Sequence, residues 1–151
     1  MLLFKPEHRP LILSGQKTQT RRLWPHGCRV RVGAEHQAQT GMFSKDCFAI
    51  LHIERVWREN LWDISDADAV AEGYIDRPDY LEAFIRINRM TTQTGEYPSD
   101  LPVWAVAFHV AYPGTRVQRA AALFAETQGT TLEALRASGN WTGLKQQEGR
   151  A

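Results

Sequence analysis

The chain has 151 residues, of which 43% are apolar and 23% are charged. This length fits one globular domain of roughly 100–150 residues, and such a domain buries a core without disulfides or a structural metal. Eighteen Lys and Arg against 17 Asp and Glu give a formal net charge of +1. That total argues against a histone-like basic protein, an acidic tail protein and a disordered chain.

No targeting segment is expected, because only three apolar residues follow Met1 before the charge of Lys5. No window approaches the roughly 20 apolar residues of a membrane-spanning helix. Cys28 and Cys47 fit no zinc pattern, and the histidines show no HxH or HxxxH spacing. We therefore predict a cytoplasmic protein with two reduced thiols, and without a metal, a cofactor, a membrane partner or an obligate protein partner.

The first half of the chain is predicted to contain three strands and one helix. A strand over 2–5 precedes a short helix over 10–14, which Gly15 ends. Residues 29–32 alternate charged and apolar side chains, which is the period of a half-buried strand. Residues 48–57 are the longest strand candidate, because they are rich in Ile, Val and aromatic residues.

Two helices and a strand are predicted next. The first helix begins at a capping pattern over 65–68 and ends at Gly73. The second begins at Pro78 and carries acidic residues early and basic residues late, as the helix dipole favours. The face expected to pack on the sheet consists of Leu81, Phe84, Ile85 and Asn88. A strand over 103–110, apolar on both faces, is expected to be covered on both sides.

This order of elements predicts an α+β domain over 1–112, built on a mixed or antiparallel sheet that can close into a barrel. Residues 113–151 are predicted to form a helical C-terminal extension, packed on the domain or partly flexible, with helices over 116–127 and 130–139. The two extension helices have the outline of a helix-turn-helix. The second carries only one basic residue, Arg136, which is poor for reading DNA.

The most informative segment is 15–22, which places Lys17, Thr20 and Arg22 within six residues after a helix end. If the chain is extended there, Thr20 and Arg22 share one face, and Lys17 in the preceding turn can swing towards it. A hydroxyl, an ammonium and a guanidinium on one spot suit a phosphate or a nucleobase. The alternative is a basic, solvated loop.

A second basic stretch contains Arg21, Arg29 and Arg31, with Trp24 between them. Cations interleaved with an aromatic ring are typical of single-stranded nucleic acid binding, although arginines also protect a solvated strand edge from pairing. Charge is unevenly distributed along the chain: residues 1–34 have a net charge of +6 and residues 59–100 a net charge of −7. An anionic partner is therefore expected on one face only.

The pattern Gly15-x-Lys17-x-x-Thr20-x-Arg22 resembles the signature of ASCH (activating signal cointegrator homology) domains of the PUA-like superfamily. Residues 3–6, 63–74 and 102–108 are similar to small prokaryotic members in the same order, so the resemblance runs from residue 1 to about 112. It implies a PUA-like β-barrel with helices around it and a cleft beside the motif. It also implies a link to RNA, because the family includes binding modules, 4-acetylcytidine amidohydrolases and ribonucleases.

In the amidohydrolase-type members, the motif lysine and threonine act with a glutamate on a later helix. By position these residues are Lys17, Thr20 and Glu72, with Arg22 as a ligand or structural partner. Lys17 would take a proton from Thr20, which attacks the acyl carbon, and Glu72 would protonate the leaving amine. On RNA, Lys17 and Glu72 would instead serve a ribose hydroxyl, with Arg22 on the phosphate. The alternative for Glu72 is a helix-end carboxylate that pairs with Lys17 or Arg22 only to hold the fold.

The prediction is an ASCH-type protein that binds RNA or a modified nucleoside, with a small hydrolase favoured. A non-catalytic RNA-binding module and a ribonuclease are the alternatives. The predicted catalytic residues are Lys17, Thr20 and Glu72. The residues predicted to contact substrate or RNA are Gly15, Arg21, Arg22, Trp24, Arg29 and Arg31.

Overall fold

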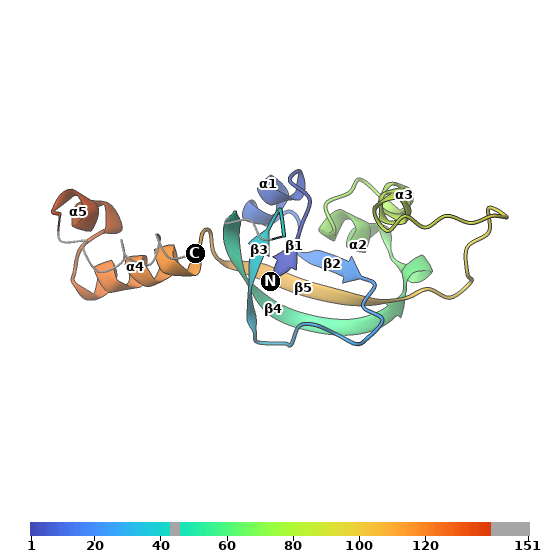
Figure 1. The fold of residues 1–151 in the computed structure, drawn as a ribbon, viewed down its shortest axis with the longest axis horizontal. Coiled ribbons are helices and arrows are strands. Elements are labelled where there is room, and N and C mark those ends of the chain that lie inside the picture. The colour runs from blue at the N-terminus through green and yellow to red at the C-terminus, as the bar shows by residue number, and fades with distance from the viewer. Residues whose placement is uncertain (43–45, 140–151) are drawn as a thin grey trace.

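A computed structural model describes residues 1–42 and 46–139. Its five strands form one curled sheet in the order β1-β3-β4-β5-β2. Helices α1, α2 and α3 lie on the same side of this sheet, and α4 and α5 extend beyond one end of it (Figure 1). The strands are β1 (Leu2–Leu3), β2 (Gln19–Arg22), β3 (Glu35–Gln39), β4 (Cys47–Asn60) and β5 (Pro102–Tyr112). The helices are α1 (His8–Leu13), a 3₁₀ turn η1 (Leu61–Asp63), α2 (Asp66–Ala71), α3 (Arg77–Ile87), α4 (Arg116–Thr127) and α5 (Leu132–Ala137).

The long antiparallel pair β4 and β5 forms the centre of the sheet. Its register shifts twice, after Ile50 and after Ile53, and such irregularities bend a strand and increase its twist. β3 pairs antiparallel with β4, β1 pairs parallel with β3, and β2 pairs antiparallel with β5. The predicted α+β fold is confirmed. In place of a closed barrel, the five strands form a curled open sheet whose two edges are β1 and β2.

Two apolar clusters cover the sheet. The larger joins β1, β3, β4 and β5 to α1, where Ile12 is fully buried. The second joins η1, α2 and α3 to the start of β5. Both Ala105 and Val106 are fully buried, so β5 is covered on both faces as its sequence predicts.

Local sequence signals account for the helices. Pro10 is the third residue of α1, in the first turn, where a missing N–H costs no hydrogen bond. Ser65 caps α2 by accepting from the Asp68 N–H at 3.1 Å. In α3 the buried residues are Tyr80, Ala83 and Phe84, whereas Asn88 is exposed, so the predicted packing face is only partly correct.

The predicted strand over 29–32 is wrong, because this segment is irregular and the strand that follows is β3. Val30 is buried in the larger cluster, but Val32 is 62% exposed, so the alternation does not correspond to a sheet face. The chain joins the sheet only when the Gly33 N–H donates to the Ile53 carbonyl at 2.8 Å.

The C-terminal extension is helical where the structure describes it. A capping box of Thr115 and Gln118 begins α4, and the Arg119 guanidinium pairs with the Glu35 carboxylate of β3 at 2.6 Å. Residues 140–151 of the predicted extension lie outside the described residues. Within the described ranges, no helix has the length and apolar character needed to cross a membrane.

Candidate active site

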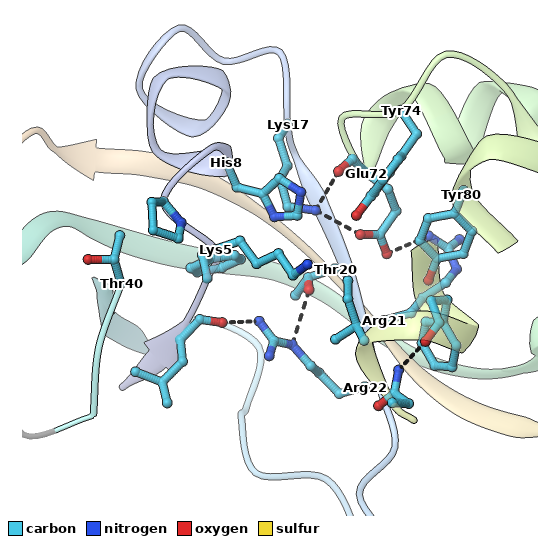
Figure 2. A pocket seen from close by; sticks show the side chains of 16 residues that line it. Lys5, His8, Lys17, Thr20, Arg21, Arg22, Thr40, Glu72, Tyr74 and Tyr80 are labelled. Carbon is cyan, nitrogen blue, oxygen red and sulfur yellow. Dashed lines mark hydrogen bonds and ion pairs between the residues drawn. The ribbon is translucent and has the colours of Figure 1, made fainter. Parts of the chain in front are cut away.

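A cavity of about 330 Å³ opens where the two edges of the sheet approach each other (Figure 2). We call this place the seam. One side consists of β1 and the segment that follows it, and the other consists of β2 with α2 and α3. The residues used below that line the cavity are Phe4, His8, Lys17, Thr20, Arg21, Arg22, Glu72, Tyr74, Tyr80 and Phe84. Its volume lies near the lower end of the roughly 300–1,000 Å³ typical of small-molecule sites, so it suits a single small unit of a ligand.

Arg22 bridges the seam with its side chain. Its Nη2 donates to the Leu3 carbonyl at 2.5 Å, its Nε donates to Thr20 Oγ1 at 3.1 Å, and the guanidinium lies 5.2 Å from the centroid of the Phe4 ring. Within the described residues, no carboxylate lies within 4.0 Å of it. The cavity wall therefore carries a guanidinium without a direct ion-pair partner, which favours an anionic or carbonyl-rich ligand.

Lys17 lies at the floor of the cavity and is 2% exposed. Its Nζ donates to the Gln19 carbonyl at 3.0 Å, to the Glu72 carbonyl at 2.6 Å and to Glu72 Oε2 at 2.7 Å. These three bonds use the full donor capacity of an ammonium group. Burial lowers the pKa of Lys17, and the charge of Glu72 opposes that shift.

Glu72 follows α2 directly, and its carboxylate and its carbonyl both face Lys17. Gly73 adopts φ +93°, a conformation that favours glycine, and a Cβ there would lie 2.9 Å from Leu11 Cδ1. The Thr18 N–H also donates to the Ala71 carbonyl at 2.8 Å. The segment that carries the motif thus caps the carbonyl end of α2, where a cation is favourable.

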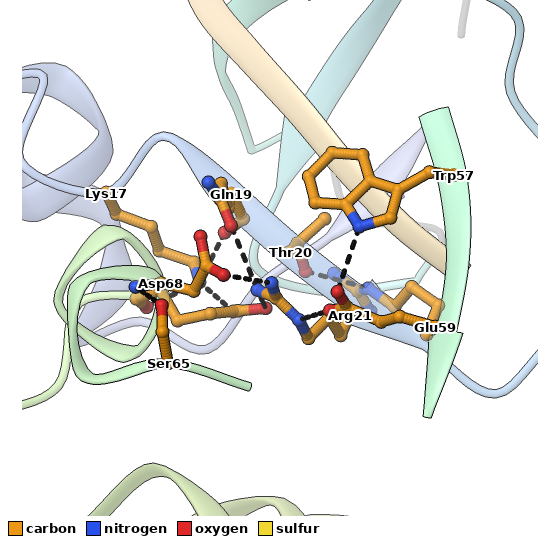
Figure 3. A network of polar contacts seen from close by, with 10 residues as sticks. Lys17, Gln19, Thr20, Arg21, Trp57, Glu59, Ser65 and Asp68 are labelled. Carbon is orange, nitrogen blue, oxygen red and sulfur yellow. Dashed lines mark hydrogen bonds and ion pairs between the residues drawn. The ribbon is translucent and has the colours of Figure 1, made fainter. Parts of the chain in front are cut away.

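Arg21 projects from the face of β2 opposite to that of Thr20 and Arg22, and its side chain is fully buried (Figure 3). Its Nε donates to Glu59, its Nη1 lies 3.3 Å from Glu72 Oε1, and its Nη2 lies 3.4 Å from Asp68 Oδ2. Three carboxylates from the acidic segment 59–100 therefore surround one arginine of the basic segment 1–34. Part of the charge contrast seen in the sequence is neutralised inside the protein.

Aromatic side chains form the other wall of the cavity. The ring centroids of Tyr74 and Tyr80 lie 5.4 Å apart, and those of Tyr80 and Phe84 lie 5.9 Å apart. Tyr80 is 3% exposed, and its hydroxyl has no hydrogen-bond partner within the part of the chain that the structure describes. Burial raises the pKa of Tyr80, so the phenol stays neutral and can donate. Since buried polar groups are normally paired, this hydroxyl is a candidate ligand contact.

His8 gives the site a pH-dependent contribution to stability. Burial, with the charge of Lys17, lowers its pKa from 6.5 to about 4. As the pH falls, His8 therefore takes up a proton in the unfolded chain before it does so in the folded protein. The free energy of unfolding consequently decreases between pH 6.5 and pH 4, by about 3 kcal/mol in total. In His8→Phe, which retains a ring beside Tyr74, urea unfolding should show a flatter stability profile between pH 7 and pH 4.5. Equal slopes in the two proteins would contradict this assignment.

The structure brings together five of the residues predicted for the site: Lys17, Thr20, Arg21, Arg22 and Glu72 all line the cavity. Thr20 and Arg22 share one face, as expected from an extended chain. The Lys17 ammonium makes no hydrogen bond to the Thr20 hydroxyl, because Gln19 and Glu72 take all three of its donors. Glu72 pairs with Lys17, as the structural alternative requires, and also lines the cavity.

Four residues predicted to contact substrate or RNA do not line the cavity. Gly15 lies at the exposed end of α1, and Trp24 is half-buried against the larger apolar cluster. Arg29 and Arg31 are exposed on the segment that follows β2. A role for these residues in RNA binding stays a prediction.

Three residues that line the cavity were not predicted from the sequence, namely His8, Tyr74 and Tyr80. Tyr74 is the last residue of the segment 63–74 that resembles ASCH domains, so the resemblance could have indicated it. His8 and Tyr80 face the cavity only because α1 and α3 pack on either side of the motif, and no local signal reveals this. Within the described ranges there is no group of three or more His, Cys, Asp or Glu residues that could hold a metal ion.

No family model and no curated protein matches the sequence. Solved structures match in fold. An ASCH domain from Lactobacillus crispatus is 23% identical, with a TM-score of 0.55 over 69% of this chain and 70% of that one. A DUF984 protein from Enterococcus faecalis is 18% identical, with a TM-score of 0.56 over 73% of each chain. A mutant ASCH protein from Zymomonas mobilis is 14% identical, with a TM-score of 0.51 over 74% of this chain and 68% of that one.

Proposed function

Because the chain has the fold of ASCH domains, we propose that it binds RNA and receives one nucleoside unit in the cavity at the seam. The observation that carries this proposal is the composition of the cavity. Aromatic rings line one side of the cavity. Among the described residues, the Arg22 guanidinium has no carboxylate within 4.0 Å. The Tyr80 hydroxyl has no hydrogen-bond partner in the same part of the chain. Proteins read single nucleotides by stacking the base on such rings and by hydrogen bonding its edge.

The hydroxyl of Tyr80 provides a direct test. In Tyr80→Phe the ring remains, and the affinity for the bound nucleoside should fall about five- to tenfold, which corresponds to one hydrogen bond of roughly 1–1.5 kcal/mol. Calorimetric titration with a panel of natural and acylated nucleosides measures this. The same change at Tyr97, whose ring contacts Trp62 outside the cavity, should leave the affinity unchanged. If the wild-type protein binds neither nucleosides nor single-stranded RNA, the proposal fails.

A second candidate function is hydrolysis of an acylated nucleoside, favoured by the Lys17–Glu72 pair at the cavity floor near Thr20. A proton moves from the Lys17 ammonium to Glu72 across 2.7 Å, and burial favours the neutral amine that results. The amine then accepts the Thr20 proton while Oγ1 attacks the acyl carbon, and Glu72 protonates the leaving amine. Water cleaves the resulting ester. Substrate binding must first bring Lys17 and Thr20 into contact, a tightening common in catalytic sites.

Thr20→Val separates chemistry from binding, because valine has the shape of threonine but no hydroxyl. Turnover of acylated nucleosides should fall at least about 10²-fold, with the Lys17–Glu72 pair intact. Lys17→Ala and Glu72→Gln should lose turnover as well, and labelled single-stranded RNA in the same panel tests the ribonuclease alternative. If the wild-type protein binds RNA in a salt-dependent way but turns over neither substrate, the non-catalytic binding module is the correct function.

A further inference from the structure

A transverse row of side chains crosses three strands beside the cavity. In the sheet register, Arg22 of β2 lies opposite Trp104 of β5, and Trp104 lies opposite Arg58 of β4. Residues directly opposite each other in antiparallel strands project from the same face. All three therefore project from the face of the sheet that carries Thr20, and we call them the Arg–Trp–Arg row.

The row combines cations with an aromatic ring. The Arg58 guanidinium lies 5.2 Å from the centroid of the Trp104 ring. Arg58 is exposed, and neither it nor Arg22 has a carboxylate within 4.0 Å in the described ranges. Trp104 is half-buried, and its indole N–H also has no hydrogen-bond partner among the residues described. Guanidinium groups without a carboxylate in contact, next to an aromatic ring, are the groups that proteins use on single-stranded nucleic acids.

The row continues from the cavity. Arg22 belongs to both, because it lines the cavity and begins the row. Neighbouring strands lie about 4.8 Å apart, so the row extends roughly 10 Å from β2 to β4. A row of this length can reach from a nucleoside in the cavity to the nucleotide that flanks it in an RNA strand.

We propose that the Arg–Trp–Arg row binds the backbone of a single-stranded RNA whose one nucleoside occupies the cavity. The inference rests on the proposed function and identifies the residues that bind the RNA strand outside the cavity. Charge complementarity supports this occupant, because the arginines lack carboxylate partners and each phosphate carries a negative charge. Trp104 distinguishes a nucleic acid from an acidic peptide, because it offers a stacking surface to a base.

The chain provides a matched control for Arg58. Arg55 lies on the same strand, is exposed, and lies 4.0 Å from the centroid of the Trp57 ring. Trp57 pairs with Ala105, which pairs with Arg21, so Arg55 and Trp57 project from the opposite face of the sheet. Arg55→Gln and Arg58→Gln remove the same charge from the two faces of one strand.

The experiment measures the affinity of both variants for a labelled single-stranded RNA octamer by fluorescence anisotropy, and for the best nucleoside by calorimetry. The wild-type protein should bind the octamer more tightly than the nucleoside. Arg58→Gln should weaken octamer binding about five- to tenfold and reduce the slope of log affinity against log salt by about 0.7. It should leave nucleoside affinity within about twofold. Arg55→Gln should behave as the wild type in both measurements.

Three results would overturn the inference: equal losses in the two variants, an unchanged salt slope in Arg58→Gln, or equally tight binding of an oligoglutamate of the same charge. Failure of the inference alone is recognisable, because nucleoside binding would still weaken in Tyr80→Phe while Arg58→Gln had no effect. If the wild-type protein binds neither nucleoside nor octamer, the proposed function fails together with the inference.

Discussion

Replacing Lys17 by methionine should lower the free energy of unfolding by about 3 kcal/mol at pH 7. Methionine fills a similar volume, so the loss arises because the Glu72 carboxylate remains buried without its main cation. The Arg21 Nη1 at 3.3 Å still offers partial compensation, which places the loss at the lower end of the usual range of about 3–5 kcal/mol. Urea denaturation followed by circular dichroism measures it.

The double variant Lys17→Met/Glu72→Leu provides the control. Removing both charges leaves no unpaired ion at the cavity floor, so the double variant should be more stable than Lys17→Met alone. A single-variant loss below about 1 kcal/mol would show that water reaches the carboxylate, which would contradict its 4% exposure.

Replacing Arg21 by leucine should cost still more, about 4–5 kcal/mol at pH 7. Glu59, Asp68 and Glu72 would then face one another around an apolar side chain, so like-charge repulsion adds to the loss of the buried cation. Urea denaturation followed by circular dichroism measures this loss as well.

The arginine Arg86 shows what an exposed ion pair contributes. It pairs with Glu82 one helical turn away at 3.8 Å, and its side chain is 66% exposed. Arg86→Leu should therefore change stability by less than about 0.5 kcal/mol under the same conditions. If Arg21→Leu and Arg86→Leu had similar effects, the network around Arg21 would not be a stabilising feature of the fold.

Elements with strong local signals could be predicted from the sequence. The strands β4 and β5 were recognisable from β-branched and aromatic residues, and Ser65 and Pro78 marked the starts of two helices. β3 could not be predicted, because Glu35–Gln39 is polar and only its last two residues are buried. It is a strand because β4 supplies its hydrogen bonds, so pairing with a distant segment overrides its low propensity.

The residues of the candidate site also divide into those with a local sequence signal and those without one. Lys17, Thr20 and Arg22 are close in sequence, so an extended strand is enough to bring them together. Glu72 could be assigned only through the resemblance to ASCH domains, because a contact across 55 residues leaves no local pattern.

The tryptophans were harder to interpret. Trp57 and Trp104 are both half-buried beneath exposed arginines. Their surroundings depend on the register of β4 against β5, which composition does not reveal.

The cap that Lys17 provides for α2 has a consequence for genetics. The Lys17 ammonium lines the cavity and also donates to the Glu72 carbonyl at the end of α2. Substitutions of Lys17 should therefore destabilise the fold and appear in a screen as low protein abundance. A variant that accumulates normally but has lost its activity is more readily obtained at Thr20, whose hydroxyl accepts a single hydrogen bond within the described residues, from Arg22. In a library selected for both expression and function, the two positions should therefore fall into different phenotypic classes.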